Sequence, residues 1–271
     1  KLVKPHHFYW RRLVIVLLVV VTLAWTGTRA QAVTVAELLK RVEVLKLQLF
    51  KQQLCAILKK ACLPPVVVSA QYPLHRNITA AVFWVGEPEG NGSSEDNALS
   101  AWDDDWQENY GGYDDPRNRH GYYPADFVPR QNPFYLDLPY NDFNNNGTRK
   151  QNAQKVVPWA GTKTWGSRES MMKNQWVRLV KDDKTCYGQI EDAGPYQYDD
   201  HAYVFGTNDA RPLNRQANNA GMDVSPALRD CLAFNGWNNV DNQVDWQFVN
   251  FVEVPAGPWK GIVTTAQINW P

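Results

Sequence analysis

The feature that most constrains the fold is the texture of the chain from Ile78 onward. Short β-prone runs are separated by clusters of Gly, Pro, Asn and Asp, which favour turns. The expected strands are Thr79 to Val85, Trp176 to Val180, Thr185 to Ile190, and Val244 to Val252. The pattern predicts a mainly β domain with long loops.

Two segments stand out from this pattern. The stretch from Glu87 to Arg130 is rich in Asp, Tyr, Trp and Gly, and is too long for an ordinary connection, so we expect an elaborate surface or binding loop. One helix is expected after the first 76 residues. It starts at Ser225-Pro226, with Ser at the N-cap and Pro in the first turn, and stops before Asn235-Gly236.

The N-terminal segment has the order of a secretion signal. Basic residues precede an apolar run from Leu13 to Trp25, and Ala30-Gln31-Ala32 offers a cleavage site before Val33. We therefore expect a signal peptide at residues 1–32 and a protein that is secreted, periplasmic or on the cell surface. An uncleaved signal anchor is the alternative.

The next residues predict an amphipathic helix. Thr34-Val35-Ala36-Glu37 forms a capping box, and apolar residues follow at alternating spacings of three and four to about Lys60. We divide the rest of the chain into a coiled-coil-like helix at 33–63, a linker at 64–76 and a β-barrel domain at 77–271. The helix could support self-association or pack on the barrel.

The four cysteines fit two disulfides in an oxidising compartment, with three possible connectivities. We expect Cys186 to pair with Cys231, because both should face one core, and Cys55 to pair with Cys62. Metal ligation is not expected, since the chain has neither a Cys-x-x-Cys pair nor a His cluster.

Charge and aromatic content bound the function. Lys plus Arg equals Asp plus Glu at 28 each, so nothing in the net charge draws the chain to nucleic acid. The chain has 12 Trp, 12 Tyr and 10 Phe. Exposed aromatic rings can stack on sugars, although filling of the core accounts for many of them.

Three motifs follow one another in a characteristic order: Glu191-Asp192-Ala193-Gly194-Pro195, Gly221-Met222-Asp223-Val224-Ser225-Pro226-Ala227, and Val244-Asp245-Trp246-Gln247-Phe248-Val249. This order resembles double-psi β-barrels, the superfamily of rare lipoprotein A, expansins, barwin and family 45 endoglucanases. The segment from Asn132 to Asp142 is similar to the Leu-Pro-(Tyr/Phe)-Gly segment of that superfamily, with Asn141 in place of Gly. The resemblance implies a six-stranded double-psi β-barrel.

The resemblance also implies a functional acid. The Asp of the Asp-Leu-Ser motif corresponds to Asp223, where a carboxylic acid could protonate a leaving glycosidic oxygen. A helix-capping role is the alternative. Asp192, before Gly194-Pro195, could stabilise the turn or take part in catalysis.

Inverting hydrolysis needs a second carboxylate, whereas a lytic transglycosylase or an expansin works with one. Candidates are Asp142, Glu87 and the run Asp103-Asp104-Asp105. Family 45 enzymes carry an Asp directly after the Trp that corresponds to Trp84, but this chain has Val85, which argues against efficient hydrolysis. We expect Asp142 to be the nearest acidic partner of Asp223.

These observations leave two functions open. The first is a secreted cell-wall or polysaccharide-active protein, either cleaving glycosidic bonds or loosening the wall as expansins do. The second is a non-catalytic module that binds polysaccharide or another protein. The expected partner is a polysaccharide or peptidoglycan, with no cofactor. Asp142 to Gly147 matches half of a calcium loop, but position twelve is Ala153, so no metal is expected. The aromatic residues expected to line the groove are Trp84, Trp102, Trp106, Tyr110 and Tyr140.

Overall fold

The computed structural model describes residues 71–90, 93 and 95–267. The signal peptide at 1–32, the helix at 33–63, most of the linker and the Cys55–Cys62 pair lie outside these residues. Among the helices described, none is long and apolar enough to span a bilayer.

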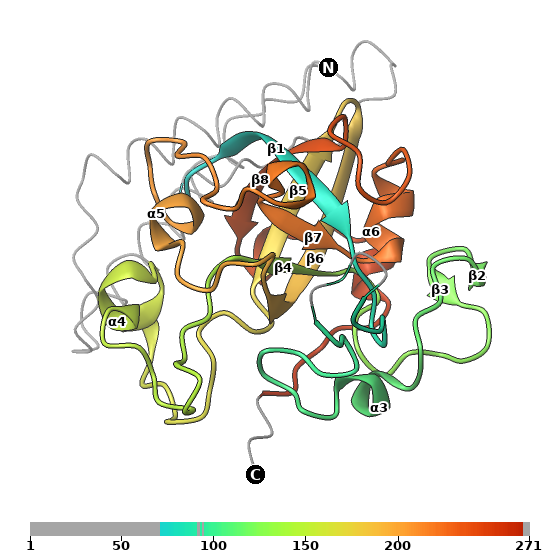
Figure 1. The fold of residues 1–271 in the computed structure, drawn as a ribbon. Coiled ribbons are helices and arrows are strands. Elements are labelled where there is room, and N and C mark those ends of the chain that lie inside the picture. Colours follow the sequence, from blue (N-terminus) through green and yellow to red (C-terminus); the bar gives the residue numbers. More distant parts are fainter. Residues whose placement is uncertain (1–70, 91–92, 94, 268–271) are drawn as a thin grey trace, which may run out of the picture. The chain divides into compact units, whose positions relative to one another are not determined.

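Six strands close into a barrel (Figure 1). The order around the barrel is β1-β7-β4-β6-β5-β8. Two pairs are parallel, β1 with β7 and β4 with β6, and the other four are antiparallel. The strands are β1 (His75–Val82), β4 (Tyr135–Leu138), β5 (Trp176–Lys181), β6 (Lys184–Ala193), β7 (Met222–Val224) and β8 (Gln243–Val249).

The mainly β prediction is therefore confirmed, as is the closure into six strands. The two shortest strands of the barrel, β4 and β7, lie within the family-like motifs and were not expected from β-prone runs. A separate pair, β2 (Arg119–His120) and β3 (Tyr123–Pro124), forms a small sheet inside the long segment after Glu87.

The helix expected after Ser225 is present as α6 (Pro226–Cys231). Its cap is the Ser225 side chain, which accepts a hydrogen bond from the Leu228 N–H. The expectation of a single helix is wrong, because three short helices also occur: α3 (Trp106–Tyr110), α4 (Ala153–Val156) and α5 (His201–Val204). Each is only four or five residues long, so packing rather than sequence periodicity stabilises it. In Figure 1, α6 lies on one side of the barrel, and α4 and α5 lie on the other.

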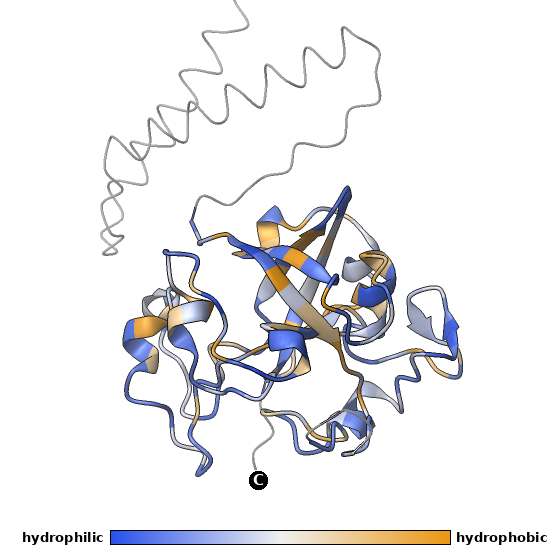
Figure 2. Ribbon diagram, turned by 45° about the horizontal axis from the view of Figure 1, so that its top comes forward, coloured by the Kyte–Doolittle hydropathy of each residue, from blue (hydrophilic) through white to orange (hydrophobic). Residues whose placement is uncertain are grey.

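The barrel core consists of apolar side chains from all six strands. Leu136, Val177, Leu179, Ile190 and Trp246 are fully buried. Hydrophobic residues recur along the strands, whereas the tip of the β5–β6 hairpin is hydrophilic (Figure 2). Gly188 in β6 allows close packing, since a Cβ there would come 2.7 Å from the Phe134 carbonyl oxygen.

β6 also buries polar side chains, and each of them attaches a different loop. Gln189 binds the C-terminal segment, accepting the Thr264 N–H at 2.9 Å and donating to the Thr264 carbonyl at 3.0 Å. Glu191 pairs with buried Lys173 at 2.9 Å. Asp192 accepts the Ala101 N–H at 2.7 Å. β6 therefore attaches three loop segments to the barrel, those that contain Thr264, Lys173 and Ala101.

The expected disulfide between Cys186 in β6 and Cys231 in α6 is confirmed, with a Cα–Cα distance of 6.3 Å. It fixes α6 to the barrel across 45 residues of sequence. Replacing both cysteines by Ser is expected to lower the free energy of unfolding by about 2 to 4 kcal/mol, because the unfolded chain regains the entropy of this loop. Denaturant titration with and without reductant tests this. Reductant should bring the parent close to the double variant, and equal stability of all samples would contradict the prediction.

Candidate active site

A cavity of about 550 Å³ opens at one end of the barrel. Its walls come from the end of β1 and the residues after it, from the ends of β4, β6 and β7, and from the loop after α6. The polar and aromatic residues that line it are Trp84, Glu87, Ser93, Glu95, Asn97, Tyr113, Arg117, Asp137, Asp192, Tyr196, Tyr198, Asp223, Trp237 and Asn238.

Three aspartates come together because their strands are neighbours. Asp223 lies in β7, Asp137 in β4 and Asp192 in β6, and the strand order is β7-β4-β6. The register shifts between Leu136 and Asp137, so that Asp137 pairs with Asp192 and Glu191 is the extra residue of a β-bulge. Bulges re-aim side chains and are frequent beside active sites. Without this bulge, Glu191 would occupy the position beside Asp137.

Backbone amides hold two of these carboxylates. The Asp223 N–H donates to Asp137 Oδ1 at 2.7 Å. Asp192 Oδ1 accepts from the N–H groups of Ala101 and Ala193 at 2.7 and 2.8 Å. Gly194 leaves room for the cluster, because a Cβ there would come 2.7 Å from Asp137 Oδ2. By contrast, Asp223 Oδ1 is buried and has no hydrogen-bond partner.

The three carboxyl groups are protonated more readily than ordinary ones. Burial, followed by repulsion from Asp192, raises the pKa of Asp223 to about 7. Burial also raises the pKa of Asp192 to about 7, against its two backbone hydrogen bonds. The pKa of Asp137 lies well above its usual range, because of burial and then repulsion from Asp223 and Asp192. No ion pair within the described residues reaches any of the three.

Glu87 faces the same cavity from the segment after β1. Its side chain is buried, and Asn97 donates a long hydrogen bond of 3.4 Å to Oε2. Burial, and then repulsion from Asp223, raises the pKa of Glu87 to about 7. Glu87 and Asp223 therefore interact electrostatically, as expected of two carboxyl groups in one site.

Aromatic side chains form the remaining wall. Trp84 and Trp237 are half-buried, and their ring centroids lie 5.5 Å apart. The Trp84 indole N–H donates to the Tyr113 hydroxyl at 2.9 Å. Tyr196 has a φ of 57° in the left-handed region, which is unfavourable for a residue with a side chain and which clusters at functional sites.

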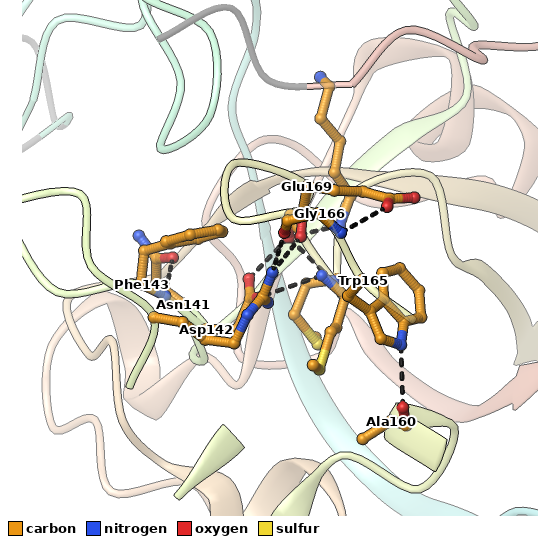
Figure 3. A network of polar contacts seen from close by, with 12 residues as sticks. Asn141, Asp142, Phe143, Ala160, Trp165, Gly166 and Glu169 are labelled. Carbon is orange, nitrogen blue, oxygen red and sulfur yellow. Dashed lines mark hydrogen bonds and ion pairs between the residues drawn. The ribbon is translucent and has the colours of Figure 1, made fainter. Parts of the chain in front are cut away.

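Asp142 does not lie in the cavity, contrary to the expectation that it faces Asp223. It is fully buried in a separate network (Figure 3), where it accepts hydrogen bonds from the Ser170 hydroxyl at 2.6 Å and the Met171 N–H at 2.8 Å. Arg149 forms an ion pair with it at 2.5 Å and also donates to the carbonyl oxygens of Gly166 and Glu169. The chain leaves β4 at Leu138, so Asp142 falls among these loops.

Four of the five expected aromatic residues are also elsewhere. Trp84 lines the cavity, but Trp102, Trp106, Tyr110 and Tyr140 are fully buried and do not. The indole N–H groups of Trp102 and Trp106 are satisfied by Asn141 and Gln131, each at 3.0 Å. The run Asp103-Asp104-Asp105 does not line the cavity either. These aromatic side chains fill the core and anchor loops.

The sequence interpretation missed Asp137, Tyr113, Tyr196, Arg117 and Trp237. A signal was present for Asp137, which is the one charged residue in the apolar run Tyr135-Leu136-Asp137-Leu138. A charged side chain inside a buried strand is costly and is therefore often functional or specifically bonded. Nothing local to Tyr113, Arg117 or Trp237 indicated that the three would meet.

The geometry defines a class: a closed, mixed six-stranded β-barrel with an acidic cavity walled by aromatic rings. No protein-family model matches the chain, and no curated protein matches it. Among the described residues, no group of three or more His, Cys, Asp or Glu side chains is arranged to hold a metal ion. The side chains that line the cavity can transfer protons, form hydrogen bonds and stack on a ring.

The raised pKa of Asp192 predicts a pH dependence of stability. Its pKa is about 7 in the folded state and near its ordinary value of about 4 in the unfolded state. Its contribution to stability is therefore fully present below about pH 4 and is lost as the pH rises through about 7. Between pH 5 and pH 8 the free energy of unfolding of the parent should fall, and that of Asp192→Asn should fall by about 1 to 3 kcal/mol less. Urea unfolding at both pH values measures the difference. The control is Asp183→Asn, whose carboxylate is exposed; a parent-like pH profile for both variants would contradict the prediction.

The network around Asp142 predicts a structural role for Arg149. Arg149→Met leaves a buried carboxylate without its cation, so we expect a loss of about 3 kcal/mol in the free energy of unfolding. The matched control is Lys181→Met, which breaks the surface pair with Asp182 and should cost less than about 1 kcal/mol. Equal costs for the two variants would show that the buried pair is not stabilising.

Proposed function

We propose that the chain is a secreted, polysaccharide-active protein of the double-psi β-barrel type, and that it cleaves glycosidic bonds with Asp223 as the proton donor. The observation that carries this proposal is the position of Asp223: it lines a cavity of about 550 Å³, the residue is partly exposed, and its pKa is raised to about 7. A general acid has to be protonated near the working pH and free to reach the leaving oxygen.

Glu87 is the partner that a hydrolytic mechanism requires. Asp137 and Asp192 are each held by backbone amides at 2.7 to 2.8 Å, whereas Glu87 has a backbone hydrogen bond at Trp84 and a long one of 3.4 Å from Asn97. Since Glu87 and Asp223 come from different walls and repel each other, one proton shared between them leaves one acid and one base. The base activates water, or, in an expansin-like or transglycosylase mode, Asp223 acts alone. Glu87, one of the candidates for the second carboxylate, lies three residues after Trp84 and lines the cavity that Val85 does not reach.

Two features support the double-psi type. The barrel has two parallel strand pairs, β1 with β7 and β4 with β6, within an otherwise antiparallel closure. The motif order along the chain is that of the superfamily, and the Asp223 motif opens α6 at the cavity. The Cys186–Cys231 disulfide supports an oxidising compartment, in agreement with secretion.

Incubation with cellulose and with peptidoglycan tests the proposal. Asp223→Asn should lose at least about 100-fold in cleavage rate, in the range that general acids contribute. Glu87→Gln should lose a comparable factor if the mode is hydrolytic and little if Asp223 acts alone. Asp183→Asn on the distant hairpin should behave as the parent.

The pH profile gives a second readout of the same prediction. Because Asp223 has to be protonated, the rate should fall as the pH rises through about 7. Burial is the main reason for the raised Asp223 pKa, and repulsion from Asp192 adds to it; Asp192→Asn removes the repulsion, so the alkaline limb should move to lower pH. If no polysaccharide is cleaved, or if Asp223→Asn is as active as the parent, the catalytic proposal is wrong and the barrel is a binding module.

A further inference from the structure

The charges that line the cavity are strongly unequal. Five carboxylates face it, from Glu87, Glu95, Asp137, Asp192 and Asp223, and Arg117 is the one basic residue among the lining side chains described. The whole chain has equal numbers of acidic and basic residues, so this excess is local. A cleft lined by one sign of charge attracts ligands of the opposite sign.

No ion pair within the described residues neutralises this excess. None of the five carboxylates takes part in an ion pair there, although ten other pairs do form. Asp223 Oδ1 is buried without a donor. A buried carboxylate that has neither a cation nor a full set of donors is costly, so a ligand that supplies both is favoured. In the free protein, protonation removes the cost of the buried negative charge. A ligand with an ammonium group can remove the same cost by pairing with the carboxylate.

The shape and the aromatic wall indicate what carries that ammonium. Trp84 and Trp237 are half-buried, and Tyr113 is 41 % exposed, so part of each side chain can contact an apolar ring surface. Trp237 already has Arg229 over its ring at 4.6 Å and Arg117 at 5.9 Å. Cations are therefore accommodated beside these rings, as expected from the negative face of an indole. A sugar ring that bears an amine matches both the acidic side chains and the aromatic wall of the cavity.

We propose that the cavity binds a glycan whose sugars carry free amino groups, with the ammonium placed among Asp137, Asp192 and Asp223 and the sugar faces against the tryptophans. This inference rests on the proposed polysaccharide activity and specifies its substrate class. A neutral glycan supplies hydroxyl donors but no charge, and an acidic glycan adds repulsion. A basic peptide matches the charge but not the aromatic wall.

The direct experiment is calorimetric titration of the full chain at pH 6.5 and low salt. The ligands are glucosamine hexamer, its fully N-acetylated counterpart and hexalysine. Glucosamine hexamer should bind at least about tenfold more tightly than the N-acetylated hexamer. A tenfold ratio is the free energy of a shift of one pKa unit, which we expect when one ammonium group pairs with a cavity carboxyl group. The difference should shrink at high salt, as screening requires. Binding should also release protons, seen as a dependence of the heat on the buffer, because an ammonium lowers the pKa of the carboxyl groups beside it.

Variants at the cavity rim test the charge argument without touching the proposed acid or base. Glu95→Gln should weaken binding of glucosamine hexamer, and Arg117→Gln should strengthen it, because they change the cavity charge in opposite directions. Asp183→Asn, on the β5–β6 hairpin, should leave the affinity for glucosamine hexamer unchanged. Equal affinity for the two hexamers, or tighter binding of hexalysine than of glucosamine hexamer, would overturn the inference.

The two proposals fail in different ways. Product analysis of the same samples records cleavage independently of affinity. Cleavage of an N-acetylated or neutral glycan, without preference for amino groups, would remove the inference and leave the catalytic proposal standing. Selective binding of glucosamine hexamer without cleavage of any glycan would do the reverse.

Discussion

The pairing of Asp137 with Asp192 across β4 and β6 is the constraint around which the cavity is organised. Two carboxyl groups in register on neighbouring strands, both buried, oppose folding unless they are protonated or given donors. The chain uses both means: backbone amides from Ala101, Ala193 and Asp223 bind them, and their pKa values are raised. Because the Ala101 amide belongs to the long segment after Glu87, satisfying Asp192 also positions that cavity wall.

Much of the fold could be predicted from the sequence. The β-prone runs indicated four of the six barrel strands, and Ser225-Pro226 indicated the cap of α6. β4 and β7 could not be found in this way, because strands of four and three residues are too short to show a periodic pattern. The helices α3, α4 and α5 could not be predicted for the same reason, since each has only four or five residues.

The candidate site was predictable only in part. Asp223, Asp192, Glu87 and Trp84 line the cavity as the motifs suggested. Asp142 does not, because its partners Arg149, Ser170 and Met171 are distant in sequence and no local pattern reveals them. Trp106 and Tyr110 lie four residues apart on one face of α3, a spacing that favours burial together over display in a groove.

One hydrogen bond makes the position of Asp137 independent of the Asp223 side chain. Asp137 is held by the backbone amide of residue 223 and not by its side chain. Exchange of the Asp223 side chain therefore leaves the anchor of Asp137 in place. On the proposed mechanism, one substitution at residue 223 would remove the proton donor and leave a cavity that can still bind a ligand.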